Sequence, residues 1–179
     1  MVPLMDFKIV PATAGTHAAA VREIFNDAIE HTTALYDYQP RSPTTVLQWF
    51  GAKARAGHPV LAAVDGAGML LGFASYGTFR AWPAYKYSIE HSLYVHRDRR
   101  RRGVGRQLLL QLVEQATQQG YRTMIGGIDA DNQASIALHE AQGFVHAGTI
   151  RDAGYKFGRW LDLAFYQKVL PGPQRPAEE

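Results

Sequence analysis

The sequence predicts a mixed α/β fold in which one central sheet carries helices on both faces. Three observations support this prediction. The length of 179 residues suits one domain. Apolar residues recur with the helical period in four segments and form short, strand-like runs in seven others. The resulting order, β-α-α-β-β-β-α-β-α-β-β, is typical of helices packed on a sheet.

The first three elements are a strand and two helices. The strand ends at about Val10, and the helix over 16–30 places five apolar residues on one stripe: Val21, Ile24, Phe25, Ala28 and Ile29. Ser42 is a capping residue followed by a proline, Pro43, in the first turn. We therefore expect a second helix from there to about Gly57.

A hairpin and a further strand follow. Apolar runs over 60–64 and 69–78 are joined by a glycine-containing turn at 65–68, which predicts an antiparallel pair. The stretch 79–86 is aromatic and contains a proline, so we expect a loop there. Residues 87–95 form the next predicted strand.

The remaining elements alternate between helix and strand: a helix over 104–120, a strand over 123–128, a helix over 135–142, and strands over 144–150 and 161–169. Gly143 closes the last helix. The predicted domain covers residues 6–170, and the proline-rich tail over 171–179 is expected to be disordered.

Composition excludes several classes of protein. The chain has no cysteine, which rules out disulfides, cysteine-ligated metals and a cysteine acyl-enzyme. The histidines and carboxylates show no metal-ligand spacing, so we expect no metal. The sequence contains neither a signal-peptide pattern nor an apolar run of membrane-span length, and we expect a cytoplasmic protein without a membrane partner.

Positive charge is concentrated in one short segment. The net charge of the chain is +3, but residues 97–106 alone carry six arginines and one aspartate, so the rest sums to −2. A nucleic-acid-binding protein usually spreads its charge over a face or a tail. The concentration here indicates a local anion site, and we expect no nucleic-acid partner.

The segment from Arg99 to Gly105 joins a predicted strand to a predicted helix. Pyrophosphate binding needs free N–H groups at a helix N-terminus, glycines that permit close approach, and arginines that donate charge-assisted hydrogen bonds. All three are present in the correct order. The glycine spacing matches neither a Walker loop nor a dinucleotide fingerprint. A solvated basic turn is the alternative interpretation.

Two motifs resemble those of the GCN5-related N-acetyltransferase (GNAT) family. Arg100, Gly103 and Gly105 match its Q/R-x-x-G-x-G/A motif. A second pattern, an asparagine followed by a short helix and E-x-x-G-F, is matched by Asn132, Glu140, Gly143 and Phe144. The resemblance covers nearly the whole chain and implies a mostly antiparallel sheet and acetyl-CoA as co-substrate. The implied cofactor-binding residues are Leu93, Val95, Arg100, Arg101, Arg102, Gly103, Val104, Gly105, Arg106, Asn132 and Ser135.

Three stretches outside these motifs resemble the phosphinothricin and methionine sulfoximine/sulfone acetyltransferases, which are herbicide-resistance enzymes. They are 30–33, 78–82 together with 85–95, and 154–162. The resemblance implies acetylation of the α-amine of an amino-acid-like acceptor. It also implies a homodimer whose interface contributes to the acceptor pocket.

The chemistry needs a base, because a protonated amine cannot attack a thioester. The resemblance places that base at Glu90; a structural surface salt bridge is the alternative. Backbone N–H groups of Leu93 or Val95 are candidates for stabilising the oxyanion. Many relatives have a tyrosine where this chain has His139, which could protonate the leaving thiolate or be purely structural. We expect direct transfer in a ternary complex, since no cysteine can carry the acyl group.

Acceptor binding is assigned to residues around the aromatic loop. Arg80 could grip the acceptor carboxylate in a bidentate manner. Further candidates that could line the pocket, or simply pack, are Trp82, Tyr85, Tyr87, Thr33, Tyr36 and Lys156. Lys156 and Arg159 could instead pair with Asp162 as a structural bridge.

Other functions use the same motifs. The acceptor could be a protein N-terminus, a polyamine or an aminoglycoside, although Arg80 disfavours cationic substrates. A non-catalytic acyl-CoA sensor should lack a base such as Glu90. A nucleic-acid binder would show steep salt dependence.

Overall fold

The computed structural model describes residues 6–178. Its strands are β1 (Phe7–Pro11), β2 (Val60–Asp65), β3 (Leu70–Thr78), β4 (Ser88–Val95), β5 (Thr123–Asp129), β6 (Val145–Lys156) and β7 (Arg159–Val169). Its helices are α1 (Ala14–His31), α2 (Pro43–Arg55), α3 (Val104–Gln118) and α4 (Gln133–Glu140). The strands are hydrogen-bonded in the order β1-β2-β3-β4-β5-β7-β6, and only the β4–β5 pair is parallel among the pairs with a defined register. The predicted element order and the mixed, mostly antiparallel sheet are confirmed.

The chain folds into two compact units. The first comprises residues 6–75 and 92–112, and the second comprises 76–91 and 113–178. Two short 3-10 helices that the sequence analysis did not predict, Pro83–Tyr85 and Arg97–Arg99, lie within loops of these units. No helix in residues 6–178 is long and apolar enough to cross a membrane.

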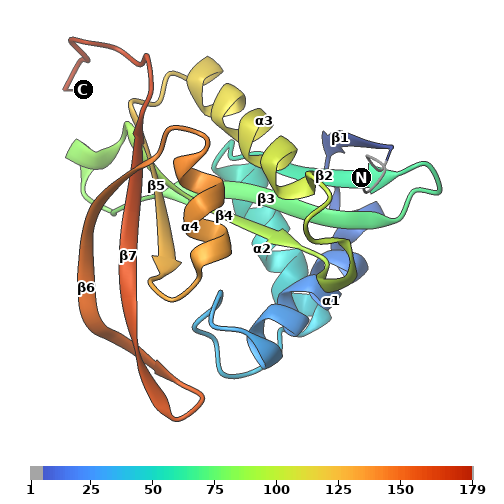
Figure 1. The fold of residues 1–179 in the computed structure, drawn as a ribbon. Helices are drawn as coiled ribbons and strands as arrows, with labels where there is room; N and C mark the ends of the chain where they lie inside the picture. Colours follow the sequence, from blue (N-terminus) through green and yellow to red (C-terminus); the bar gives the residue numbers. More distant parts are fainter. Residues whose placement is uncertain (1–5, 179) are drawn as a thin grey trace. The chain divides into compact units, whose positions relative to one another are not determined.

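The first unit packs α1 and α2 against the hairpin of β2 and β3 (Figure 1). The buried stripe of α1 is the predicted one: Val21, Ile24, Phe25, Ala28 and Ile29. Phe25 contacts Phe73 and Trp49 edge to face, at ring-centroid distances of 4.8 and 5.3 Å. Ser42 caps α2 by accepting a hydrogen bond from the Thr45 N–H, as predicted.

The opposite face of β3 in this unit lies against α3. Gly72 has no side chain there, and a Cβ would come within 2.7 Å of the Tyr94 carbonyl oxygen and 3.3 Å of Leu108. Both faces of this part of the sheet are therefore covered by helices, as the sequence predicts.

The second unit contains β5 to β7 and α4. Strand β5 pairs with β7 from Thr123↔Val169 to Asp129↔Leu163, and with the first half of β4 in parallel. The β6–β7 hairpin is longer than predicted and extends to the Lys156↔Arg159 pair. Most β6 side chains are exposed. The added residues consequently lack the alternating pattern from which strands are recognised.

Candidate active site

The arginine-rich segment of the first unit forms a strand-to-helix junction. Gly103 has φ +82° and Arg101 φ +59°, so the backbone turns sharply there before α3 begins at Val104. Val104 is buried and anchors the turn. The first N–H groups of a helix have no partner within the helix, and the helix dipole adds partial positive charge. This junction, residues 100–106, is called the cradle below; its backbone suits an anionic diphosphate.

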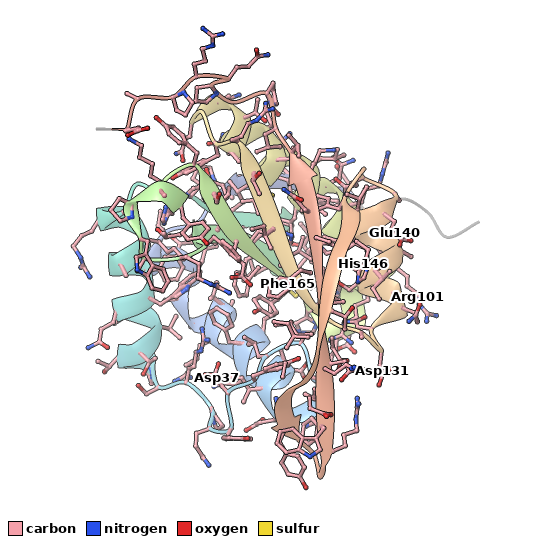
Figure 2. All side chains as sticks on the ribbon, turned by 90° about the vertical axis from the view of Figure 1, so that its left-hand side faces the viewer. Asp37, Arg101, Asp131, Glu140, His146 and Phe165 are labelled. Atoms are coloured by element: carbon pink, nitrogen blue, oxygen red, sulfur yellow. The ribbon has the colours of Figure 1, made fainter. Side chains whose placement is uncertain are left out.

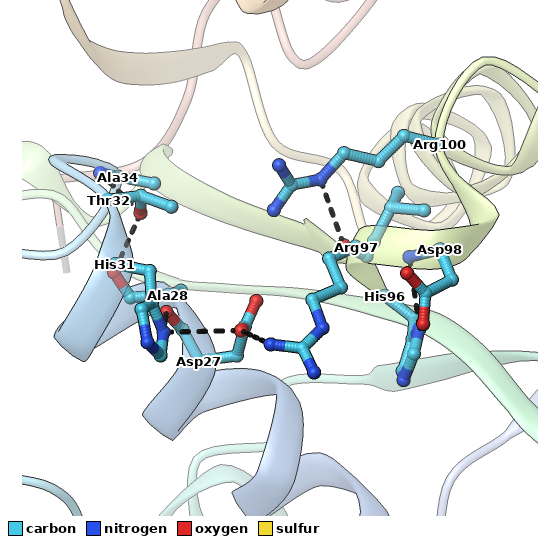
Figure 3. A network of polar contacts seen from close by, with 10 residues as sticks. Asp27, Ala28, His31, Thr32, Ala34, His96, Arg97, Asp98 and Arg100 are labelled. Atoms are coloured by element: carbon cyan, nitrogen blue, oxygen red, sulfur yellow. Dashed lines mark hydrogen bonds and ion pairs between the residues drawn. The ribbon is translucent and has the colours of Figure 1, made fainter.

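The arginines of this segment differ in their contacts (Figure 3). Arg97 donates to Asp27 of α1 at 3.0 Å, and His31 lies 3.3 Å from the same carboxylate. Arg97 therefore has a structural partner away from the cradle. Arg100 turns its Nε toward the Val95 carbonyl oxygen at 3.5 Å, and the Arg101 side chain is exposed. These contacts hold the end of β4 and the cradle together.

Glu90 lies on β4 in the second unit and is half-buried. Burial raises the pKa of its carboxyl group, and the nearby Arg80 charge partly counters this rise. The carboxylate lies against β5, where a Cβ on Gly127 would meet Glu90 Oε1 at 3.0 Å and Leu163 at 3.3 Å. A glutamate with a raised pKa and a nearby cation is suited to act as a general base.

The loop after β3 carries the predicted acceptor-binding residues. The Arg80 guanidinium lies 4.1 Å from the Phe79 ring centroid and donates to the Phe79 carbonyl oxygen at 2.8 Å. Phe79 also contacts Phe165 of β7 and Tyr85 edge to face. Figure 2 shows Phe165 on the side of β7 away from Glu140 of α4. An aromatic cluster thus supports the arginine in the same unit as Glu90.

Other predicted pocket residues have varied surroundings. Trp82 is 68% exposed and Tyr85 41%, whereas Tyr87 is half-buried with Lys86 Nζ 5.4 Å from its ring centroid. In the first unit, after α1, Thr33 is half-buried and Tyr36 is exposed.

Lys156, Arg159 and Asp162 lie at the far end of the β6–β7 hairpin, and their partners can be identified there. Lys156 is buried at the end of β6, with its Nζ 5.0 Å from the Phe157 ring centroid. Arg159 pairs with Asp131 at 3.0 Å and lies 3.7 Å from Asp129, so these carboxylates, and not the alternative Asp162, are its partners. Asp162 instead accepts a hydrogen bond from the Asp152 N–H.

His139 forms a buried pair with His91. The Nε2 atoms lie 3.1 Å apart, the rings stack, and His139 Nδ1 lies 2.6 Å from the Ser135 carbonyl oxygen. A carbonyl can only accept, so His139 Nδ1 carries a proton. With both rings neutral, His139 Nε2 then accepts from His91 Nε2–H. Burial and the neighbouring ring lower the pKa of His91 to about 3, and burial lowers the pKa of His139.

Asn132 and Ser135 lie at the start of α4. Asn132 caps the helix by accepting a hydrogen bond from the Ser135 N–H at 3.1 Å. This contact gives Asn132 a structural role as the N-cap of α4. The helix begins at Gln133, two residues before its predicted start, because the cap precedes it.

The structure places Glu90, Arg80, Trp82, Tyr85, Tyr87 and His139 in the second unit, together with Asn132, Ser135 and Lys156. It places Leu93, Val95, the cradle, Thr33 and Tyr36 in the first. The sequence alone did not indicate that Phe79, His91, Gly127 and Phe165 lie beside these residues. The consecutive glycines at 126 and 127 in a strand were a usable signal of close approach. No group of three metal-binding side chains occurs within residues 6–178.

The chain is similar in sequence to known acetyltransferases. The model of the acetyltransferase (GNAT) family matches residues 19–144. An L-methionine sulfoximine/L-methionine sulfone acetyltransferase of Pseudomonas paraeruginosa is 46% identical over 154 residues, covering 86% of this chain and 89% of that protein. A phosphinothricin N-acetyltransferase of Streptomyces viridochromogenes is 36% identical over 173 residues, covering 94% and 92%.

A solved structure is also similar along nearly the whole chain. The phosphinothricin acetyltransferase of Sinorhizobium meliloti, in complex with acetyl-CoA, has a TM-score of 0.92 at 34% identity, covering 97% of this chain and 95% of the other. The matched segment includes both the cradle and Glu90. The chain therefore belongs to the acetyltransferase (GNAT) family.

Proposed function

We propose that this chain transfers the acetyl group of acetyl-CoA to the α-amine of a methionine sulfoximine, methionine sulfone or phosphinothricin type of amino acid. The observation that carries the proposal is the half-buried Glu90 carboxylate with the Arg80 charge close to it. These two groups match the two ends of an amino acid acceptor. The relatives named above act on the same class of compound.

The acceptor must lose a proton before it attacks. Glu90 accepts that proton, directly or through one water, and its raised pKa makes it a stronger base than an exposed glutamate. Arg80 binds the acceptor carboxylate by charge-assisted hydrogen bonds. The amine nitrogen then bonds to the thioester carbon and releases its second proton to solvent, and the carbon–sulfur bond breaks in the same ternary complex. The products are the N-acetyl amino acid and free coenzyme A.

The cradle and the end of β4 bind the acetyl donor. The cradle binds the diphosphate through N–H groups at the start of α3 and through Arg100, Arg101 and Arg102. Backbone N–H groups of Leu93 or Val95 stabilise the oxyanion that forms during attack. Asn132 and Ser135 are proposed to contact the donor in addition to capping α4.

We assign protonation of the leaving thiolate to solvent rather than to His139. The ring nitrogens of His139 contact the Ser135 carbonyl oxygen and His91. Its lowered pKa also disfavours the cationic form that a proton donor needs.

We further propose that the chain is a homodimer and that the β6–β7 hairpin contributes to its interface. Large apolar side chains are exposed on this hairpin, including Tyr155, Phe157 and Trp160 at 48%, 58% and 60%. Such a concentration of exposed aromatic surface is typical of protein–protein contacts. Because acetyl-CoA is an intracellular metabolite, we place the reaction in the cytoplasm.

A thiol-release assay with acetyl-CoA and a panel of acceptors tests the proposed function. The panel contains methionine sulfoximine, methionine sulfone, phosphinothricin, spermidine, an aminoglycoside and a peptide N-terminus. We expect turnover of the first three. Turnover confined to the others would overturn the assignment of Arg80 to a carboxylate, and no turnover despite acetyl-CoA binding would favour a sensor.

A further inference from the structure

The ring of Phe79 has three neighbours in the second unit. The Arg80 guanidinium lies 4.1 Å from the ring centroid, and the rings of Tyr85 and Phe165 contact it edge to face, with centroids at 5.7 and 6.4 Å. Phe79 and Phe165 are partly buried, whereas Arg80 is exposed. The Phe79 ring therefore connects an exposed cation to strand β7.

The backbone of Phe79 is fixed as well. Its N–H donates to the Ser88 carbonyl oxygen at 3.2 Å, and its carbonyl oxygen accepts a hydrogen bond from Arg80 Nη1 at 2.8 Å. The loop between Phe79 and Ser88 contains a 3-10 turn in which the Lys86 N–H donates to the Pro83 carbonyl oxygen at 3.0 Å. Phe79 thus holds the arginine at two points, its ring and its carbonyl, on a loop whose ends are joined by a hydrogen bond.

These two contacts affect how Arg80 can bind an anion. An exposed arginine side chain has many rotamers, and ordering them costs free energy when a ligand binds. The planar fork of a guanidinium binds a carboxylate in a bidentate manner only in the correct orientation. A cation–π contact and a hydrogen bond from Nη1 restrict that orientation before the acceptor arrives.

The same aromatic contacts reach the proposed base. A Cβ on Gly127 would lie 3.0 Å from Glu90 Oε1 and 3.8 Å from Phe165 Cε1, so Glu90 and Phe165 border the same side of Gly127. Gly127 and Phe165 are also opposite each other in the β5–β7 register. Arg80, Phe79, Phe165 and Glu90 therefore form a connected series within one unit.

We propose that Phe79 is a positioning residue that sets the selectivity of this acetyltransferase for acceptors with a free carboxylate, a proposal that rests on the proposed function. Phe79 acts through Arg80. Its ring and carbonyl hold the guanidinium in the orientation that binds the α-carboxylate, while Glu90 takes a proton from the α-amine of the same acceptor. An acceptor with a neutral amide in place of the carboxylate keeps the amine but loses the ion pair.

The test compares methionine sulfone with methionine sulfone amide as acceptors in the thiol-release assay. The ratio of their kcat/KM values is independent of the fraction of folded protein, and the difference in basicity between the two amines is common to all variants. The unaltered protein should prefer the carboxylate at least about tenfold, as expected for a hydrogen bond between charged groups. Phe79→Leu should lower the ratio by about fivefold, as expected for loss of a cation–π contact. Phe79→Tyr keeps the ring and should keep the ratio.

Two further variants separate positioning from a structural effect. Phe79→Leu combined with Arg80→Gln should give the ratio of Arg80→Gln alone, because the ring acts only through the arginine. Tyr121→Leu is the matched control, since it removes a partly buried ring that contacts Tyr76 edge to face in the same unit, and it should keep the ratio.

An unchanged ratio in Phe79→Leu would overturn the proposal, as would an equal fall in Tyr121→Leu or a further fall in the double variant. Equal use of both acceptors by the unaltered protein would overturn it too. No turnover of either acceptor by the unaltered protein would instead contradict the proposed function, so the two failures are distinguishable.

Discussion

The properties of Glu90 depend on the residues that surround it. Its carboxylate is half-buried against Gly127, and this burial raises its pKa, while the Arg80 charge acts in the opposite direction. A base is active when deprotonated. Activity should therefore be lost as the pH falls through this pKa, which burial places above the usual value of a glutamate.

Glu90→Gln should lower kcat by about 10²–10⁴-fold, the usual contribution of a general base, while the affinity for acetyl-CoA stays within about twofold. Steady-state kinetics and donor titration measure the two effects. An unchanged kcat in Glu90→Gln at every pH would show that Glu90 is not the base.

Arg80→Gln should raise the KM of the acceptor. It should also move the acidic limb of the kcat/KM profile to higher pH, because the charge that lowers the pKa of Glu90 is gone.

Gly127 makes space for the Glu90 carboxylate. In Gly127→Ala the new Cβ would lie 3.0 Å from Glu90 Oε1, so the carboxylate must shift by a few tenths of an ångström. We expect kcat to fall by about tenfold, with the KM for acetyl-CoA unchanged. Gly15→Ala, where a Cβ meets nothing within 4 Å, is the control and should keep the original kcat. Equal kcat values in the two variants would contradict this role.

At the scale of elements, the His91–His139 pair joins β4 to α4 in the second unit. A Cβ on Gly126 would lie 2.9 Å from His91 Nε2, so this glycine on β5 leaves room for the pair. His91 Nδ1 is buried without a hydrogen-bond partner, and both rings are neutral because burial lowers their pKa values. The pair thus joins α4 to β4 only while both rings are neutral.

The pair should make stability depend on pH. The folded pKa of His91 is about 3 and the unfolded value is 6.5, so the unfolded state takes up the proton first. The free energy of unfolding should therefore fall as the pH drops from 6.5 toward 3, by about 1 kcal/mol between pH 6 and 5 from His91 alone. Urea unfolding measures it. His91→Gln should flatten the dependence and exposed His146→Gln should not; equal slopes would refute the assignment.

The β6–β7 hairpin carries the proposed dimer contact. Trp160→Ser combined with Tyr155→Ser should convert the dimer to a monomer in sedimentation experiments, because both side chains are about half exposed and contribute little to the core of the chain. Leu47→Ser removes a comparably exposed apolar side chain, 52% exposed on α2, and should leave the dimer intact. A dimer that survives the double change would place the interface elsewhere.

At the scale of the whole molecule, three elements run from one compact unit into the other. They are β3, β4 and α3. We propose that residues 6–170 unfold as one domain, since neither unit has a complete set of its own elements. The ordered contacts extend slightly beyond this range, because a Cβ on Gly172 would lie 2.5 Å from the Tyr121 carbonyl oxygen.

Removal of residues 174–179 should leave the melting temperature within about 2 °C, since surface changes usually cost less than about 0.5 kcal/mol. Removal from Leu170 onward should lower it by several degrees. Leu170 is 2% exposed, its N–H donates to the Arg122 carbonyl oxygen, and its own carbonyl accepts from Arg122. Calorimetry of both truncated proteins measures their melting temperatures. A large fall in the melting temperature after removal of 174–179 would show that the tail stabilises the fold. Glu179 in this range lies outside the described residues.

The element order, the cradle and the buried stripe of α1 could all be predicted from the sequence. These features are local, because helix periodicity, a serine before a proline, and glycines next to arginines act over a few residues. Glu90 and Arg80 were identified as candidate site residues because the sequence around them resembles that of related acetyltransferases. The far half of the β6–β7 hairpin was missed, because its exposed side chains carry no alternating pattern.

Contacts between residues far apart in the chain could not be predicted in this way, because they form only in the folded protein. The contact of His91 with His139 spans 48 positions, and the place of Gly127 beside Glu90 depends on the parallel register of β4 and β5. The pairing of Arg159 with Asp131 rather than Asp162 was set in the same way. Such contacts depend on strand register and on burial, which shift pKa values and bring charges together over distances that local sequence patterns do not encode.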